Sequence, residues 1–111
     1  MRQISRLFAA SVSIGFITLA MPSFVRAQND AEKLYKTHCV LCHAPDGSGT
    51  SPSGKALKAQ DLSSELIQKK TDAELTASIT NGKGKMPAFG KKLKPDQIAQ
   101  LVGYIRALPK K

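Results

Sequence analysis

Two cysteines and a histidine lie within five residues in the stretch Cys39-Val40-Leu41-Cys42-His43. On a helix, Cys39, Cys42 and His43 fall at positions i, i+3 and i+4, which share one face because the helix repeats every 3.6 residues. Two thiols so placed can form thioether bonds to one flat porphyrin, and the neighbouring imidazole can then bind its iron. This spacing is typical of c-type haem attachment. It predicts one covalent haem c, attached by Cys39 and Cys42, with His43 as an iron ligand.

The same cysteine pair has two other interpretations. A disulfide between residues three apart would close a very short loop and would contribute little stability. A thiol-disulfide oxidoreductase would use Cys39 and Cys42 as a redox pair, but such enzymes lower the pKa of one thiol and are usually built on a βαβ scaffold. The sequence has no strand pattern. A thiol-disulfide oxidoreductase is therefore the alternative to haem attachment.

The N-terminal stretch resembles a secretory signal more than part of a folded domain. Arg2 and Arg6 precede an apolar run from Leu7 to Ala20, and a short polar segment then ends at Ala27. This order predicts a signal peptide, residues 1–27, cleaved after Ala27. An uncleaved membrane anchor is the alternative, although the run is shorter than the roughly 20 residues that span a bilayer. We therefore expect a periplasmic domain, residues 28–111, with no stable membrane span.

Charge narrows the expected partners of this domain. Removing Arg2, Arg6 and Arg26 from the 17 basic residues leaves 14, against 8 acidic residues, so the formal charge becomes +6. A cationic protein associates fastest with an acidic surface. We expect redox protein partners with acidic docking surfaces. Nucleic acid is not expected, because the exported chain has no base-reading motif.

Residues 28–111 form a small domain, and an apolar core of that size is marginal on its own. Only three aromatic residues remain in it, Tyr35, Phe89 and Tyr104. A covalently held porphyrin would supply the missing apolar bulk.

Apolar periodicity and capping signals predict four helices. The first begins at Asn29 or Asp30 and carries the cysteines, and a short helix is expected near residues 63–69. A third, over residues 71–81, starts with a Thr71–Glu74 capping box. The last starts at Pro95, ends before Pro109, and has Gly103 where a close helix crossing is expected. Its apolar face consists of Ile98, Leu101, Val102, Ile105 and Leu108. Residues 44–54 are rich in turn formers and predict a loop.

A second iron ligand is expected from the loop Gly82–Gly90. Met86 is the only methionine left once Met1 and Met21 are removed, and glycine and proline constrain the backbone around it. A histidine and a methionine are a known axial pair for haem iron. His38 is the alternative, but a residue next to Cys39 cannot reach the face of the haem opposite His43.

These residues resemble those of the class I cytochrome c family, in particular its small, exported, bacterial monohaem members. The resemblance covers nearly all of residues 30–109. It rests on the Cys39–His43 motif, Tyr35 four residues before Cys39, Pro52 in the following loop, the Met86 segment, and the closing helix around Leu101–Ile105.

The resemblance implies an all-α, small cytochrome c fold of about four helices wrapped around a covalently attached haem. In that fold the first and last helices cross, with Ala31 opposite Leu101 and Tyr104. The roles implied for matching positions are haem attachment by Cys39 and Cys42, iron ligation by His43 and Met86, and support of His43 by the Pro52 carbonyl.

The expected function is that of a soluble electron carrier, not an enzyme. With both axial positions of the iron filled by protein, no open site remains for a small-molecule substrate, and methionine ligation favours the reduced iron. Besides the thiol-disulfide oxidoreductase, the alternative is a haem subunit of a larger oxidoreductase complex.

Overall fold

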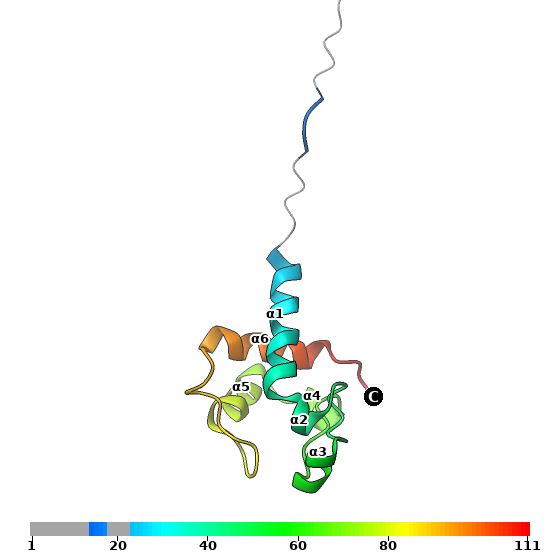
Figure 1. Ribbon diagram of the computed structural model, residues 1–111, viewed down its shortest axis with the longest axis vertical. Coiled ribbons are helices and arrows are strands. Elements are labelled where there is room, and N and C mark those ends of the chain that lie inside the picture. Colours follow the sequence, from blue (N-terminus) through cyan, green and yellow to red (C-terminus); the bar gives the residue numbers. More distant parts are fainter. Residues whose placement is uncertain (1–13, 18–22) are drawn as a thin grey trace, which may run out of the picture.

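The computed structural model describes residues 14–17 and 23–111, and its regular structure is helical (Figure 1). The helices are α1 (Ser23–His38), α2 (Val40–His43), α3 (Pro52–Leu57), α4 (Glu65–Gln68), α5 (Asp72–Asn81) and α6 (Pro95–Ala107). Within the described ranges there is no strand, only one isolated β-bridge between Lys83 and Met86. The all-α prediction is therefore confirmed, with six helices in these ranges instead of about four.

The crossing of α1 over α6 organises the protein (Figure 1). Ala31 and Tyr35 of α1 are buried at this crossing, and the ring of Tyr35 stacks on that of Tyr104 with 4.5 Å between centroids. Leu101 of α6 is only 1% exposed. The expectation for Gly103 was wrong, because this residue lies on the exposed face of α6 with no neighbouring atom within 4 Å of an added Cβ.

Helix α1 begins earlier than predicted, at Ser23 instead of Asn29 or Asp30. No glycine or proline interrupts residues 23–38, and alanine, arginine and glutamine in the first turns favour helix. Most of the predicted signal peptide lies outside the described residues, so cleavage after Ala27 stays a prediction. No helix among the residues with a described structure is long and apolar enough to cross a membrane.

Helix α3 was missed, since its residues fall partly in the predicted loop 44–54. Ser51 caps it by accepting a hydrogen bond from the Gly54 amide at 3.0 Å, and Pro52 occupies the first turn. Both are favoured at these positions because the first amides of a helix lack helical partners. The other helix starts follow the sequence signals: Ser64 caps α4, and Thr71 with Glu74 forms the capping box of α5.

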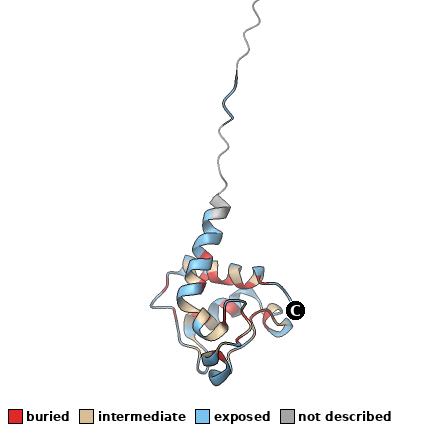
Figure 2. Ribbon diagram, turned by 45° about the vertical axis from the view of Figure 1, so that its right-hand side comes forward, coloured by how far each residue is buried: buried red, intermediate tan, exposed pale blue. Residues whose placement is uncertain are grey.

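The core lies beneath α6 and joins it to α1, α5 and the loops (Figure 2). Its members are Tyr35, Leu62, Ile67, Leu75, Ile79, Phe89, Leu93, Ile98, Leu101, Val102, Ile105 and Leu108. All five residues of the predicted apolar face of α6 belong to it. Arg106 ties the end of α6 to the other helices by donating to Asp72 at 2.9 Å and to the Gln68 carbonyl at 2.8 Å.

Candidate functional site

The structure places Cys39, Cys42 and His43 on a single helical turn at the junction of α1 and α2. The Cys39 amide donates to the Tyr35 carbonyl at 2.9 Å, and the His43 amide donates to the Cys39 carbonyl, also at 2.9 Å. The backbone thus stays close to helical across the break at Cys39, so the predicted spacing on one turn is confirmed. All three side chains are half-buried, and both thiols are free.

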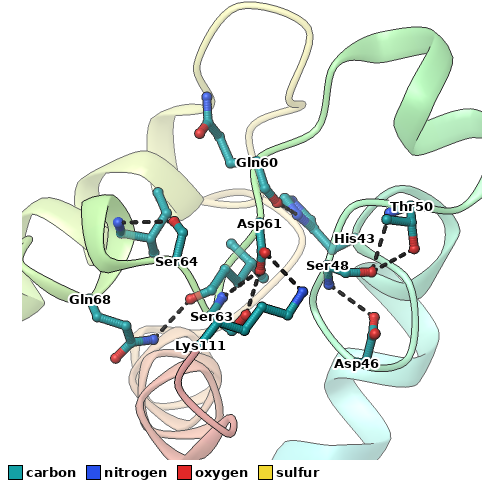
Figure 3. Close-up of polar contacts among 12 residues, drawn as sticks. His43, Asp46, Ser48, Thr50, Gln60, Asp61, Ser63, Ser64, Gln68 and Lys111 are labelled. Atoms are coloured by element: carbon teal, nitrogen blue, oxygen red, sulfur yellow. Dashed lines mark hydrogen bonds and ion pairs between the residues drawn. The ribbon is translucent and has the colours of Figure 1, made fainter.

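The orientation of His43 is fixed by a hydrogen bond to the Gln60 carbonyl (Figure 3). The distance from Nδ1 to this oxygen is 3.0 Å, and His43 must donate because a carbonyl only accepts. The prediction that Pro52 supplies this carbonyl was wrong. Pro52 is the first residue of α3, where the carbonyl accepts from the amide four residues on. The Nδ1–H tautomer leaves the Nε2 lone pair of His43 free for a metal.

Burial shifts the pKa values of His43 and Cys39 at this turn. It lowers the pKa of His43, against the opposing effect of the Gln60 carbonyl, so the neutral imidazole needed for metal ligation is favoured. Burial, with a smaller contribution from Cys42, raises the pKa of Cys39 to about 11. A thiol with so high a pKa is a poor nucleophile at neutral pH.

The chain that follows His43 folds back tightly on α2. The Tyr35 hydroxyl donates to the buried Ala44 carbonyl at 2.7 Å, and the Gly49 amide donates to the His43 carbonyl at 2.9 Å. Gly54 of α3 lies so close to α2 that an added Cβ would overlap the Cys42 carbonyl oxygen. The backbone of α3 therefore packs directly against the turn that carries the predicted attachment residues.

Met86 lies in the loop between α5 and α6, half-buried and packed against the same core cluster as Cys39. Its backbone pairs with Lys83 through two hydrogen bonds, of 3.0 and 3.1 Å. Gly82, with φ of 73°, starts the turn, and an added Cβ there would be 2.6 Å from the Met86 carbonyl oxygen. Figure 1 shows this loop, in yellow and orange, and α3 on opposite sides of the lower half of the protein.

Two further amides hold this loop against α5. Phe89 donates to the Ile79 carbonyl at 2.9 Å, and Gly90 donates to the Thr80 carbonyl at 3.0 Å. The loop is thus braced on both sides of Met86, as the glycine and proline pattern predicted.

His38 has a different environment from the other predicted residues. Its ring meets Phe89 edge-on, with 5.8 Å between the ring centroids. It also lines an open groove of about 440 Å³ between α1 and α6, whose other walls include Asp30, Asp96 and Gln100. Neither cysteine of the motif lines this groove.

The chain is similar to several known proteins. The chain matches a family model described as cytochrome c oxidase, cbb3-type, subunit III, over residues 26–105. It is 33% identical over 103 residues to cytochrome c6 of Gloeothece citriformis (strain PCC 7424), covering 92% of this chain and 89% of that protein. It is 30% identical over 105 residues to cytochrome c6 of Nostoc sp. (strain PCC 7120 / SAG 25.82 / UTEX 2576), with 95% and 92% covered.

A solved structure of the KustC0563 c-type cytochrome is also similar. It is 34% identical in sequence, superposes with a TM-score of 0.67, and covers 74% of this chain and 99% of that chain. The chain belongs to the cytochrome c family, as a small monohaem member. It accordingly carries one covalently bound haem c with its iron, and it takes part in electron transport.

The residues of the α1–α2 turn fit this cofactor. Two free thiols lie three residues apart on one helical turn, and the imidazole beside them has its Nδ1 occupied by a carbonyl and its Nε2 available. Such a second hydrogen bond is usual for a metal-bound histidine, because it fixes the tautomer and the ring orientation. The sequence offered no signal for Gln60, which lies 17 residues from His43.

Proposed function

We propose that the protein is an electron carrier whose haem is attached by Cys39 and Cys42 and whose iron is ligated by His43 and Met86. The observation that carries this proposal is the hydrogen bond from His43 to the Gln60 carbonyl, which holds the imidazole in the tautomer that can bind a metal. Two free thiols lie next to it. When bound, the haem supplies a one-electron couple. The chain would hold it through Cys39, Cys42 and His43, with Met86 of the braced loop as the second iron ligand.

The experiment combines voltammetry with ligand binding on the purified holoprotein. A carrier with both axial positions filled exchanges one electron reversibly and does not bind carbon monoxide in the reduced state. Met86→Ala keeps the haem attached, opens the sixth position, and binds carbon monoxide. Rapid binding of carbon monoxide by the unmodified protein would refute Met86 as ligand and favour a haem enzyme.

A thiol-disulfide oxidoreductase is disfavoured by the environment of its required nucleophile. Burial raises the pKa of Cys39 to about 11, whereas such enzymes depend on a lowered thiol pKa. Reduction of a disulfide substrate by the haem-free chain at neutral pH is the outcome that would restore this alternative.

A haem subunit of a larger oxidoreductase complex is the second candidate, favoured by the description of the matching family model as an oxidase subunit. A free carrier is monomeric in the cell, whereas a haem subunit stays bound to the other subunits of its complex. Size-exclusion chromatography of gently lysed native cells, followed by haem staining, yields a species near the mass of residues 28–111 for a free carrier. A stable high-mass species supports the subunit.

Processing and location belong to the same proposal. Residues 1–27 act as a signal peptide cleaved after Ala27, and the domain 28–111 works in the periplasm; the family match, which begins at residue 26, supports this division. The intact mass of the native protein tests the cleavage site. A mass that includes residues 1–27, recovered with the membrane fraction, would instead support the uncleaved anchor.

Docking to redox partners uses the lysines around Met86. Lys83, Lys85, Lys91 and Lys92 are all exposed on the loop that carries this residue. The charge of +6 on residues 28–111 and this local cluster steer the protein to acidic partner surfaces, so the association rate falls with salt over a Debye length of about 10 Å at 0.1 M.

Charge-reversal variants test whether docking depends on the lysines around Met86 or only on the net charge of the protein. Lys83→Glu with Lys85→Glu is expected to slow electron transfer to a physiological partner at low ionic strength, with spectrum and potential nearly unchanged. The matched control is Lys33→Glu with Lys110→Glu, two exposed lysines outside the Met86 loop. Equal slowing by both pairs would show that only net charge matters.

A further inference from the structure

The carbonyl that orients His43 belongs to an irregular segment, residues 58–64, between α3 and α4. No helix or strand of its own fixes the direction of this carbonyl. The segment is attached at two amides: Ala59 donates to the Gly54 carbonyl at 2.8 Å, and Leu62 donates to the Gly47 carbonyl at 2.7 Å. Between these two attachments lie Gln60 and Asp61, and the side chain of Gln60 is exposed.

Asp61 stabilises the turn that follows this carbonyl (Figure 3). One oxygen of its carboxylate, Oδ1, accepts from the Ser63 amide at 2.9 Å and from the Ser63 hydroxyl at 2.6 Å. Its other oxygen, Oδ2, accepts from Lys111 Nζ at 3.1 Å. Ser63 is only 2% exposed and Asp61 is half-buried, so water competes for these bonds only from the side of Asp61.

The peptide bond between Gln60 and Asp61 connects these two sets of contacts. Because a peptide is planar, the direction of the Gln60 carbonyl is tied to the orientation of the Asp61 amide and so to the backbone angles of Asp61. Fixing the Asp61 side chain on Ser63 restricts those angles. The carboxylate of Asp61 therefore restrains the carbonyl that accepts from His43.

We infer that Asp61 is a positioning residue for the iron ligand His43, acting through the Gln60 carbonyl and the Ser63 turn. This inference rests on the proposed role of His43. A hydrogen bond from Nδ1 makes a histidine ligand more basic, and stronger donation stabilises the oxidised iron. Asp61 thus lowers the reduction potential by keeping this bond formed. The alternative is that Asp61 only holds the C-terminal residues in place through its ion pair with Lys111.

Two substitutions at the same position separate these roles. Asp61→Asn removes the charge and the ion pair, but the amide oxygen still accepts from Ser63. Asp61→Ala removes the charge, the ion pair and both bonds to Ser63. A change in reduction potential or proton exchange that both variants share results from the lost charge. A difference between the two variants results from the lost hydrogen bonds to Ser63. Lys111→Met removes the ion pair alone and leaves the Ser63 bonds in place.

The readouts are the reduction potential and the exchange rate of the His43 Nδ1 proton, measured by NMR on the holoprotein. Asp61→Ala is expected to raise the potential beyond the value of Asp61→Asn and to accelerate Nδ1 proton exchange by about tenfold relative to it, which corresponds to about 1.4 kcal/mol. Asp61→Asn and Lys111→Met are expected to leave this exchange rate within about twofold of the unmodified protein.

Global destabilisation is excluded by the amides of Leu101 and Val102 in the buried face of α6, whose exchange is followed in the same spectra. Acceleration of these amides by the same factor as the Nδ1 proton would overturn the inference. Equal potentials and Nδ1 rates for Asp61→Ala and Asp61→Asn would overturn it too, while leaving His43 as ligand. Absence of haem-shifted His43 signals in the unmodified protein would overturn both the inference and the proposed ligand.

Discussion

Replacing Tyr35 with phenylalanine removes one hydroxyl from the crossing of α1 and α6 and leaves the aromatic stack in place. Tyr35 is 1% exposed, and its hydroxyl donates to the Ala44 carbonyl at 2.7 Å. Ala44 itself is 5% exposed and directly follows His43. The hydroxyl therefore connects the helix crossing to the end of the turn that carries the site.

The expected loss of stability depends on which hydrogen bonds the Ala44 carbonyl retains in Tyr35→Phe. Leaving a buried acceptor without any partner costs about 1–3 kcal/mol. Here the Gly47 amide still donates to this carbonyl, at 3.2 Å, so the cost falls at the lower end, about 1–1.5 kcal/mol. The stack on Tyr104 is unaffected, because phenylalanine presents the same ring. For a domain of this size the melting temperature falls by about 4–8 °C per kcal/mol.

The assay is urea unfolding of the holoprotein, followed by circular dichroism. Tyr35→Phe is expected to lower the midpoint without changing the slope, since the surface exposed on unfolding is the same. Tyr104→Phe is the matched control: it removes a hydroxyl from the half-buried partner ring and is expected to change stability by less than about 0.5 kcal/mol. An unchanged midpoint for Tyr35→Phe, or an equal loss for Tyr104→Phe, would refute the reasoning.

Three further predictions concern the site and its supports. Gly82→Ala is expected to cost at least about 1 kcal/mol in thermal unfolding, because φ is 73° and the new Cβ meets the Met86 carbonyl. It is also expected to weaken the proposed bond between Met86 and iron. An unchanged optical spectrum and melting temperature would contradict this. Cys39→Ala or Cys42→Ala should sharply lower the haem-to-protein ratio of purified protein, and a normal ratio in the double variant would exclude covalent attachment there. The hydrogen bonds of the capping box lower the pKa of Glu74. The ionised Glu74 side chain therefore stabilises the folded protein above the ordinary carboxyl pKa near 4, and this contribution is lost as the pH falls through the lowered pKa. Glu74→Gln should therefore be destabilising in urea at pH 7 and neutral at pH 2, and a pH-independent difference would count against the cap.

The parts of the fold that the sequence predicted are those encoded within a few residues. The apolar face of α6 repeats with the helical period and is buried as expected, and the capping box starts α5 at Asp72. The cysteines and His43 lie on one turn because their relation is local. Local patterns of this kind determine local structure nearly independently of the rest of the chain.

The parts that the sequence did not predict depend on contacts between distant residues. The acceptor for His43 is a backbone carbonyl, and any residue type can supply one, so Gln60 carried no signal. Helix α3 did carry one, in the Ser51-Pro52 start, but the surrounding turn formers concealed it. Gly103 was expected at the crossing of α1 and α6, yet it faces solvent, because a glycine on a helix does not reveal which face is packed.

The most direct test of the central claim is the optical spectrum of the oxidised, fully processed protein beside that of Met86→Ala. A methionine thioether on ferric haem gives a weak near-infrared charge-transfer band. We expect this band in the unmodified protein and its loss in Met86→Ala, with the haem remaining covalently attached after denaturation in both. A band that survives in Met86→Ala would contradict the account, because the sixth ligand would then come from another residue.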